Sequence, residues 1–230
     1  LRRQRQMCIR DSYERAREVT ARVSGFFKIR GFYDSVRQLN AELLRYEGHP
    51  GSMNWIGSSY LEQADYPEAK VWYQRSLETA GDSIPEESTL ALHNLASIDL
   101  ERGEYDAAHQ KFETVLKMVQ QIGDRAGEAA TWHNLATIDL NQGECDAACQ
   151  KFETALKIWQ QIGDRAGEAQ TLHNLASIDV NQGEYEEARQ KFEKVLGIKQ
   201  RIGYRAGVAA TWHELGRIDM HRGEYDAARQ

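Results

Sequence analysis

The chain has 230 residues, of which 41% are hydrophobic and 28% are charged, so it can bury a sizeable core and is not expected to be disordered. Its formal net charge of -6 argues against a large nucleic-acid surface. No apolar run in the sequence reaches the roughly 18 to 20 residues that span a bilayer, and no secretory signal is visible. We therefore expect a cytoplasmic protein that binds neither nucleic acid nor a membrane.

The two ends of the sequence are the least informative. Leu1 stands where a start methionine is expected and Gln230 falls inside a repeated unit, so we expect both ends to be cut. The string MCIRDS at residues 7–12 resembles translated adapter sequence that contaminates some assemblies. Residues 1–12 are therefore left unassigned as a suspected assembly artefact. Residues 13–50 are expected to form a degenerate helical pair.

From about Leu90 onward the sequence repeats itself every forty residues. His93, His133, His173 and His213 recur at that spacing, and so do several leucines, glycines and phenylalanines. Such a period is typical of stacked repeat architectures. It predicts a degenerate unit at 51–89, full units at 90–129, 130–169 and 170–209, and a truncated unit at 210–230.

Each unit is predicted to fold as two helices. In the best example, the helix over 126–141 places Leu135 and Ile138 on one apolar stripe. Gly143 is expected to end this helix in the left-handed conformation, and Asp164 is placed to cap the first helix of the next unit. A single unit leaves one apolar face open to water, and stacking buries it. The predicted fold is therefore all-α, an α-solenoid of stacked antiparallel helix pairs.

The repeated residues resemble the tetratricopeptide repeat, whose signature combines W-x2-L-G in the first helix with A-x3-F in the second. Trp212, Leu215 and Gly216 match the first part, while Ala148 and Phe152 match the second. HEAT and armadillo repeats share the forty-residue period, but their residue pattern does not fit. The long period is similar to that of kinesin light chains and of bacterial signalling proteins.

One departure from the signature has a structural consequence. The tyrosine of the first helix is replaced in the four later copies by an aspartate: Asp99, Asp139, Asp179 and Asp219. A partly buried carboxylate is costly unless it is paired. We therefore expect each aspartate to accept hydrogen bonds from a neighbouring helix.

The resemblance implies that the first helices line a concave groove that binds a protein or peptide. Three rows of polar residues would then face the groove, and a fourth would lie at its rim. These rows are the histidines His93, His133, His173 and His213; the amides Asn94, Asn134 and Asn174; the row Ser97, Thr137, Ser177 and Arg217; and the rim residues Asn141 and Asn181.

The row of asparagines is the most informative of these. An asparagine amide is both a donor and an acceptor, so a row at constant spacing suits the backbone of an extended peptide. Kinesin light chains carry a similar His-Asn-Leu sequence, and related long repeats bind peptides in this way. The other interpretation is that each asparagine bonds the adjacent helix, since buried polar groups usually find partners inside the fold. The sequence leaves both open.

No metal, cofactor or catalytic site is expected. Packed helices lie roughly 8 to 10 Å apart and a second helix is expected between successive first helices, so the histidines should be spread along the groove rather than converge on one ion. Cys145 and Cys149 lie on one helix face but replace Tyr185 and Arg189 of the next copy, which favours drift of one repeat over a metal site. The histidines are expected to line the groove and bond a nearby Asp or Asn.

Two functional hypotheses follow from these patterns. The first is a non-enzymatic scaffold whose groove binds a peptide or a helix of a partner protein. The alternative is the sensor or scaffold arm of a larger bacterial signalling ATPase or caspase-like protease, whose catalytic domain would lie outside this sequence. The partner's identity is not encoded in the repeat itself.

Overall fold

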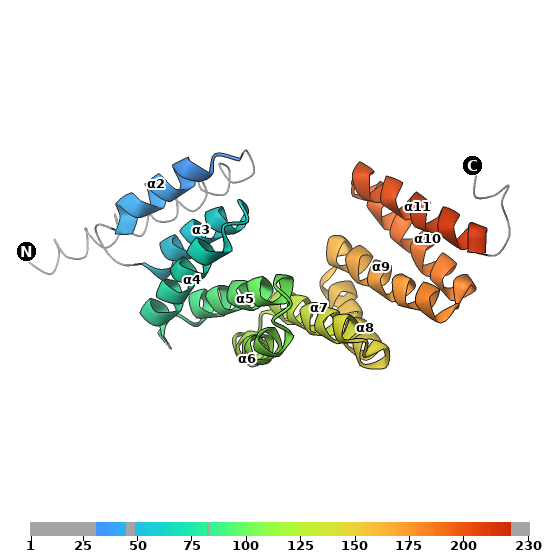
Figure 1. Ribbon diagram of the computed structural model, residues 1–230, viewed down its shortest axis with the longest axis horizontal. Coiled ribbons are helices and arrows are strands. Elements are labelled where there is room, and N and C mark those ends of the chain that lie inside the picture. The colour runs from blue at the N-terminus through green and yellow to red at the C-terminus, as the bar shows by residue number, and fades with distance from the viewer. Residues whose placement is uncertain (1–30, 45–48, 82, 222–230) are drawn as a thin grey trace, which may run out of the picture. The chain divides into compact units, whose positions relative to one another are not determined.

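The computed structural model describes residues 31–44, 49–81 and 83–221. Nearly all of them are helical and no strand occurs among them, which confirms the all-α prediction (Figure 1). The expectations for 1–12, for 13–30 and 45–48 of the first helical pair, and for 222–230 of the last unit fall on residues outside this description.

The described helices follow one another with short turns. They are α2 (Tyr33–Leu44), α3 (Pro50–Leu61), α4 (Tyr66–Ala80), α5 (Pro85–Glu101), α6 (Tyr105–Ile122), α7 (Arg125–Gln142), α8 (Cys145–Ile162), α9 (Arg165–Gln182), α10 (Tyr185–Arg201) and α11 (Arg205–His221). The chain divides into two compact units, Leu1–Lys111 and Phe112–Gln230. The forty-residue period appears in the second unit as the spacing between the starts of α7, α9 and α11.

Capping residues explain where the helices begin and end. Gly143 ends α7 with φ 85° and Gly163 ends α8 with φ 74°, both in the left-handed region that favours glycine. The carboxylate of Asp164 accepts hydrogen bonds from the backbone N–H groups of Ala166 and Gly167, 2.9 and 3.0 Å away. The predicted stop at Gly143 and the predicted cap at Asp164 are therefore confirmed.

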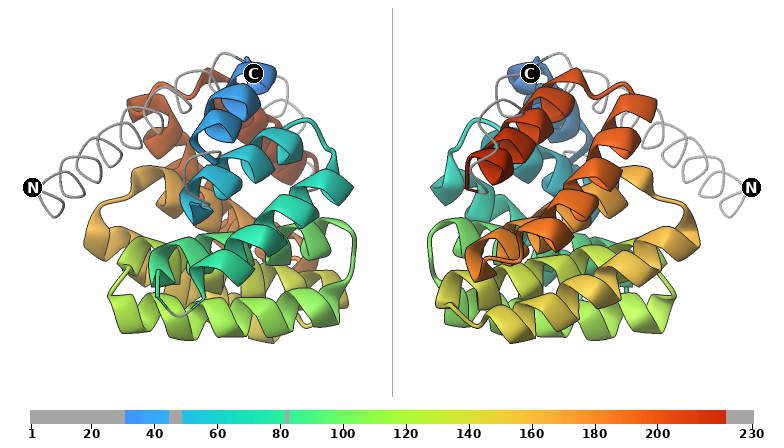
Figure 2. Two further views of the ribbon diagram at one scale, coloured as in Figure 1. Left: turned by 90° about the vertical axis from the view of Figure 1, so that its left-hand side faces the viewer. Right: turned by 90° about the vertical axis from the view of Figure 1, so that its right-hand side faces the viewer.

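The core of each unit is assembled from the apolar stripes of successive helices. In the second unit, Phe152 of α8 packs with Leu175 and Ile178 of α9, and Phe192 of α10 repeats this contact with Leu215 and Ile218 of α11. The helices of this unit pack in chain order, each against the next (Figure 2). In the first unit, Tyr73 and Ala69 of α4 pack against α5 in the same manner. Stacking thus buries the apolar face that a single helix pair would expose to water.

The row of buried aspartates is paired, as the sequence predicted. Asp99, Asp139 and Asp179 each accept a hydrogen bond from a lysine twelve residues on in the second helix of the same pair: Lys111, Lys151 and Lys191. Asp99 also pairs with Lys70 of α4 at 2.6 Å, and Asp219 pairs with Arg189 of α10. These ion pairs connect first helices to second helices. Removing a cation would leave a buried carboxylate unpaired, which is strongly destabilising.

The described part of the chain contains no helix long and apolar enough to cross a membrane.

Candidate functional site

The first helices of the second unit carry most of the residues predicted to bind a partner. His133 of α7 is buried, His173 of α9 is half-buried and His213 of α11 is exposed. Asn134 and Asn174 are both half-buried beside their histidines. In the first unit, His93 and Asn94 of α5 are likewise half-buried. The repeated positions therefore differ in exposure from copy to copy, and the exposed fraction of the histidine is largest in the last described copy.

His133 joins α7 to α9 through both nitrogens of its ring. Its Nδ1 lies 3.1 Å from Thr171 Oγ1 and its Nε2 lies 3.3 Å from Asn174 Nδ2. Because the Thr171 hydroxyl donates to the carbonyl of Gly167 at 2.9 Å, its oxygen must accept from His133. The proton therefore sits on Nδ1, and Nε2 accepts a hydrogen from the Asn174 amide. The predicted bond between a histidine and a nearby asparagine is confirmed here.

Burial keeps His133 neutral. The ring packs edge-on against Phe152 with 5.0 Å between centroids, and burial lowers the pKa of His133 to about 4. Burial also lowers the pKa of His93 and of His173, and the nearby Lys199 adds to the effect on His173 while Glu214 opposes it. A neutral imidazole is what the hydrogen bond from Asn174 requires.

The contact also adds a detail to the expected packing of the first helices. The second helix α8 packs against both α7 and α9, as expected, but the side chains of His133 and Asn174 still meet across the two first helices. Of the two interpretations that the sequence leaves open for the asparagines, this hydrogen bond shows that Asn174 does bond a neighbouring helix. It uses one of the two amide hydrogens of Asn174 and leaves the carbonyl oxygen of that amide to other donors.

The hydroxyl row is bound to its own helices. Ser97, Thr137 and Ser177 each donate to the carbonyl four residues earlier, at 2.9 to 3.0 Å. This bond is common for such residues inside helices and leaves the oxygen able to accept. Arg217, which continues the row, is exposed and pairs with Glu214 at 2.8 Å. The rim residues Asn141 and Asn181 are exposed near the ends of α7 and α9.

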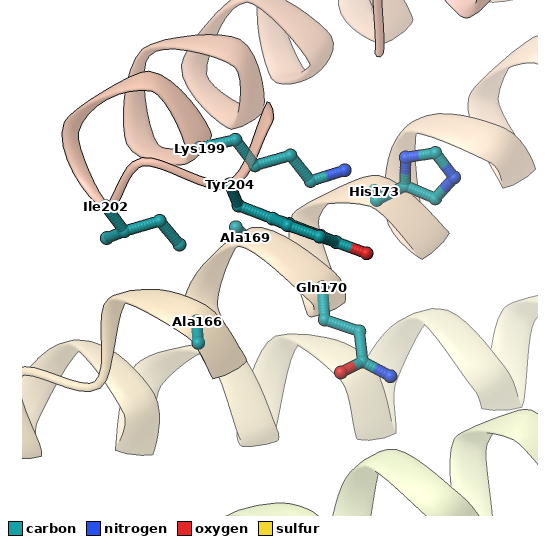
Figure 3. A pocket seen from close by; sticks show the side chains of 7 residues that line it. All are labelled: Ala166, Ala169, Gln170, His173, Lys199, Ile202 and Tyr204. Atoms are coloured by element: carbon teal, nitrogen blue, oxygen red, sulfur yellow. The ribbon is translucent and has the colours of Figure 1, made fainter. Parts of the chain in front are cut away.

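A cavity of about 390 Å³ opens beside this face between α9, the end of α10 and the turn before α11. Its lining residues are Ala166, Ala169, Gln170, His173, Lys199, Ile202 and Tyr204 (Figure 3). Only His173 belongs to the predicted rows. The other polar residues were missed, although a copy-by-copy comparison marks all three: Gln170 replaces Ala130, Lys199 replaces Trp159 and Tyr204 replaces Asp164.

Among the described residues there is no group of three or more His, Cys, Asp or Glu side chains that could hold a metal ion. Cys145 and Cys149 are half-buried free thiols on α8. Burial, together with the nearby carboxylate of Asp179, raises the pKa of the Cys149 thiol. A raised thiol pKa disfavours the thiolate that metals and electrophiles need.

The stacked helix pairs, with the same residue types repeated on their first helices, define a helical-repeat protein. A family model for the tetratricopeptide repeat matches residues 51–121 and 127–201. The matches span more than half of the chain, which therefore belongs to the tetratricopeptide repeat family. No curated protein matches the sequence.

Solved structures with the same fold include proteins from P. vanneervenii and Podosopora anserina. BtubC from P. vanneervenii is 20% identical, with a TM-score of 0.69, over 94% of this chain and 87% of that one. A putative kinesin light chain from Podosopora anserina is 19% identical, with a TM-score of 0.62, over 79% of this chain and 92% of that one.

A signal transduction ATPase with numerous domains from Pyrococcus horikoshii, which has a tetratricopeptide repeat sensor, is 16% identical with a TM-score of 0.72. The match covers 91% of this chain but only 33% of that protein. At these identities the likeness extends to the fold alone.

Proposed function

We propose that this chain is a non-enzymatic interaction scaffold that binds a peptide or a helix of a partner protein along its first helices. Tetratricopeptide repeats generally mediate protein–protein interaction. The proposed contact residues are the polar rows on α5, α7, α9 and α11, with the amides Asn94, Asn134 and Asn174 facing the backbone of the ligand. No cofactor or metal is needed for this function.

The observation that carries the proposal is the hydrogen bond from Asn174 to His133. A free asparagine side chain rotates about its terminal bond and presents either its oxygen or its nitrogen. At this position the neutral imidazole accepts from the nitrogen, so the amide is held with its oxygen turned away from the ring. A peptide N–H would then meet an acceptor that is already oriented, which lowers the entropy cost of binding.

The test begins with a random dodecapeptide library displayed on phage and selected on the whole chain. Affinities of the selected peptides are then measured by calorimetry for the wild type and for the triple variant N94A/N134A/N174A. Loss of two or three peptide hydrogen bonds, at about 0.5 to 1.5 kcal/mol each, predicts a loss of affinity of about fivefold or more.

The matched control removes amides from the second helices instead. Gln150 of α8 and Gln190 of α10 are both exposed, and Q150A/Q190A is expected to bind the selected peptides like the wild type. Thermal melts of both variants check that the fold persists. Unchanged affinity in the asparagine variant, with the fold intact, would reject the proposed contact residues.

A second candidate role is the sensor arm of a larger signalling protein. The likeness of this chain to about one third of the Pyrococcus horikoshii ATPase favours this candidate. The complete reading frame decides between the two roles. A nucleotide-binding or protease domain on the same chain would support the sensor arm, and its absence from the complete frame would exclude it.

A further inference from the structure

The pocket at the end of α10 differs from its counterpart one repeat earlier in three lining residues: Gln170 replaces Ala130, Lys199 replaces Trp159 and Tyr204 replaces Asp164. Next to the lining, Val208 replaces Glu168 and Arg201 replaces Gln161. Two of these replacements remove a carboxylate and one adds an ammonium group. The four replacements between residues 199 and 208 fall within ten residues of sequence, and each shifts the charge in the positive direction.

The first change alters what fills the space over the next first helix. Trp159 is buried with Ala129, Ala155 and Ile158, and its ring fits so closely over α9 that a Cβ at Gly167 would lie 2.5 Å from it. At the later junction the ring of Tyr204 takes this place, 2.4 Å from a Cβ at Gly207, together with Cδ of Lys199 at 2.9 Å. The cavity of about 390 Å³ lies against these two side chains, and its size falls within the range of ligand pockets.

The second consequence is a change of hydrogen bonds around His173. In the preceding copy, Nδ1 of His133 donates to Thr171. The corresponding threonine, Thr211, lies 3.2 Å from the ammonium of Lys199 instead. His173 Nδ1 is buried and has no hydrogen-bond partner among the described residues.

The third consequence is electrostatic. Arg125 and Arg165 each pair with the glutamate three residues on, Glu128 and Glu168, and Val208 removes this partner from Arg205. Tyr204 stands where an aspartate caps α7 and α9. The carboxylate that remains nearby, Glu214, pairs with Arg217. Burial lowers the pKa of Lys199, so the pocket holds a partly desolvated ammonium whose charge a bound anion would stabilise.

Figure 3 shows how these groups are arranged. Lys199 and Tyr204 extend side by side, and their ammonium and hydroxyl ends are directed toward α9, where His173 and Gln170 lie. The ring of Tyr204 and the side chains of Ala166, Ala169 and Ile202 form the apolar wall. One polar end and one apolar wall in the same cavity select a ligand that carries both kinds of group.

We propose that this pocket binds a peptide carboxylate next to an apolar side chain, with Lys199 and the Tyr204 hydroxyl holding the carboxylate and Ile202 contacting the apolar group. The inference rests on the proposed function and deepens it, because it assigns an acidic peptide to this end of the array. The side-chain carboxylate of an Asp or Glu and the carboxylate of a chain end share this chemistry, and the test separates them.

The test uses four short probes and the whole chain labelled with ¹⁵N. The probes are N-acetyl-leucyl-glutamate, its C-terminal amide, N-acetyl-leucyl-glutamine and the amide of the latter, so that each carboxylate is present or absent independently. Amide signals of Gly203, Tyr204 and His173 report binding at the pocket. We expect saturable shifts with at least one carboxylate probe and none with the probe that lacks both carboxylates.

Two variants of α10 test the role of the lysine. Lys199→Met keeps much of the side-chain volume and removes the ammonium; since a charge-assisted hydrogen bond contributes about 1.5 to 3 kcal/mol, we expect affinity to fall by about tenfold or more. Lys194→Met removes an exposed lysine from the same helix and is expected to leave affinity within about twofold. Lys199→Trp, which restores the residue of the preceding copy, is expected to abolish the shifts while the thermal melt shows the fold retained.

Three results would overturn the inference: no saturable shift with any probe, equal binding of the probe without a carboxylate, or equal losses in the two methionine variants. Its failure is distinguishable from failure of the scaffold proposal. If the phage-selected peptides lose affinity in the asparagine variant but no probe shifts the pocket signals, the groove proposal stands and the carboxylate pocket is rejected.

Discussion

The junctions of α8 with α9 and of α10 with α11 are built on the same helix pairs but use their side chains differently. At the first, Trp159 fills the space under Gly167 and Asp164 caps α9. At the second, Lys199 and Tyr204 stand in these places and a cavity opens. The backbone is set by residues that both copies retain, including Phe152 and Phe192, so the remaining positions can change without loss of the fold. Departures between copies that gather around a cavity, as Lys199 and Tyr204 do, therefore differ in kind from scattered departures such as Cys145 and Cys149.

The largest expected effect is the difference in stability lost when the side chains at matched positions of the two junctions are truncated. Trp159→Ala removes a buried aromatic ring, and such truncations cost about 3 to 5 kcal/mol. Lys199→Ala at the matched position is expected to cost about 1 kcal/mol or less, because the side chain is half-buried and fills little volume. Urea denaturation followed by circular dichroism measures both. Equal costs would contradict the assignment of Trp159 as a core residue and of Lys199 as a pocket residue.

The second effect is a dependence of stability on pH at the junction that His133 makes with α9. Its pKa is about 4 in the folded protein against roughly 6.5 unfolded, so the unfolded state binds more protons between these values. The stabilisation is therefore complete above about pH 6.5 and is lost as the pH falls toward 4. At about 1.36 kcal/mol per pKa unit the loss is on the order of 3 kcal/mol.

His133→Gln removes the titrating group, so the difference in stability between wild type and variant should shrink or reverse as the pH falls from 7 to 4.5. Exposed His213 provides the control, because His213→Gln should leave the pH dependence of the wild type unchanged. A difference between wild type and H133Q that stays constant with pH would show that His133 is not held neutral by burial.

A smaller effect compares two glycines. A Cβ at Gly167 would lie 2.5 Å from the buried ring of Trp159, whereas one at Gly207 would meet the exposed ring of Tyr204 at 2.4 Å. The buried ring cannot move aside, so Gly167→Ala should cost about 1 to 3 kcal/mol as overpacking does. Tyr204 can rotate into solvent, so Gly207→Ala should be close to neutral. Thermal melts of the two variants distinguish a rigid junction from an adaptable one.

The sequence predicted what depends on spacing and local chemistry. Gly143 and Asp164 were placed correctly because capping depends on one or two neighbouring residues. The pairing of Asp139 could be predicted in kind, since a buried acid needs a cation, but Lys151 as its partner could not. Spacing alone does not say which helices face each other. The contact of His133 with Asn174 depends on how two first helices approach. The pocket at Lys199 depends on how α9, the end of α10 and the following turn pack together.

The smallest expected effect concerns the buried aspartates of the two junctions. Arg189 of α10 pairs with Asp219, and Lys70 takes the same role toward Asp99, but Cys149 of α8 stands at this position beside Asp179. Cys149→Arg should therefore add a second cation to a carboxylate that already pairs with a lysine. Because the first pair offsets most of the desolvation cost, and because the new guanidinium would be partly exposed, the gain should be no more than about 1 kcal/mol. Cys149→Ser changes the same thiol without adding charge and should not show this gain. If both variants melt at the same temperature, the second cation adds no stability at this position, and the arginine at the corresponding position of α10 needs another explanation.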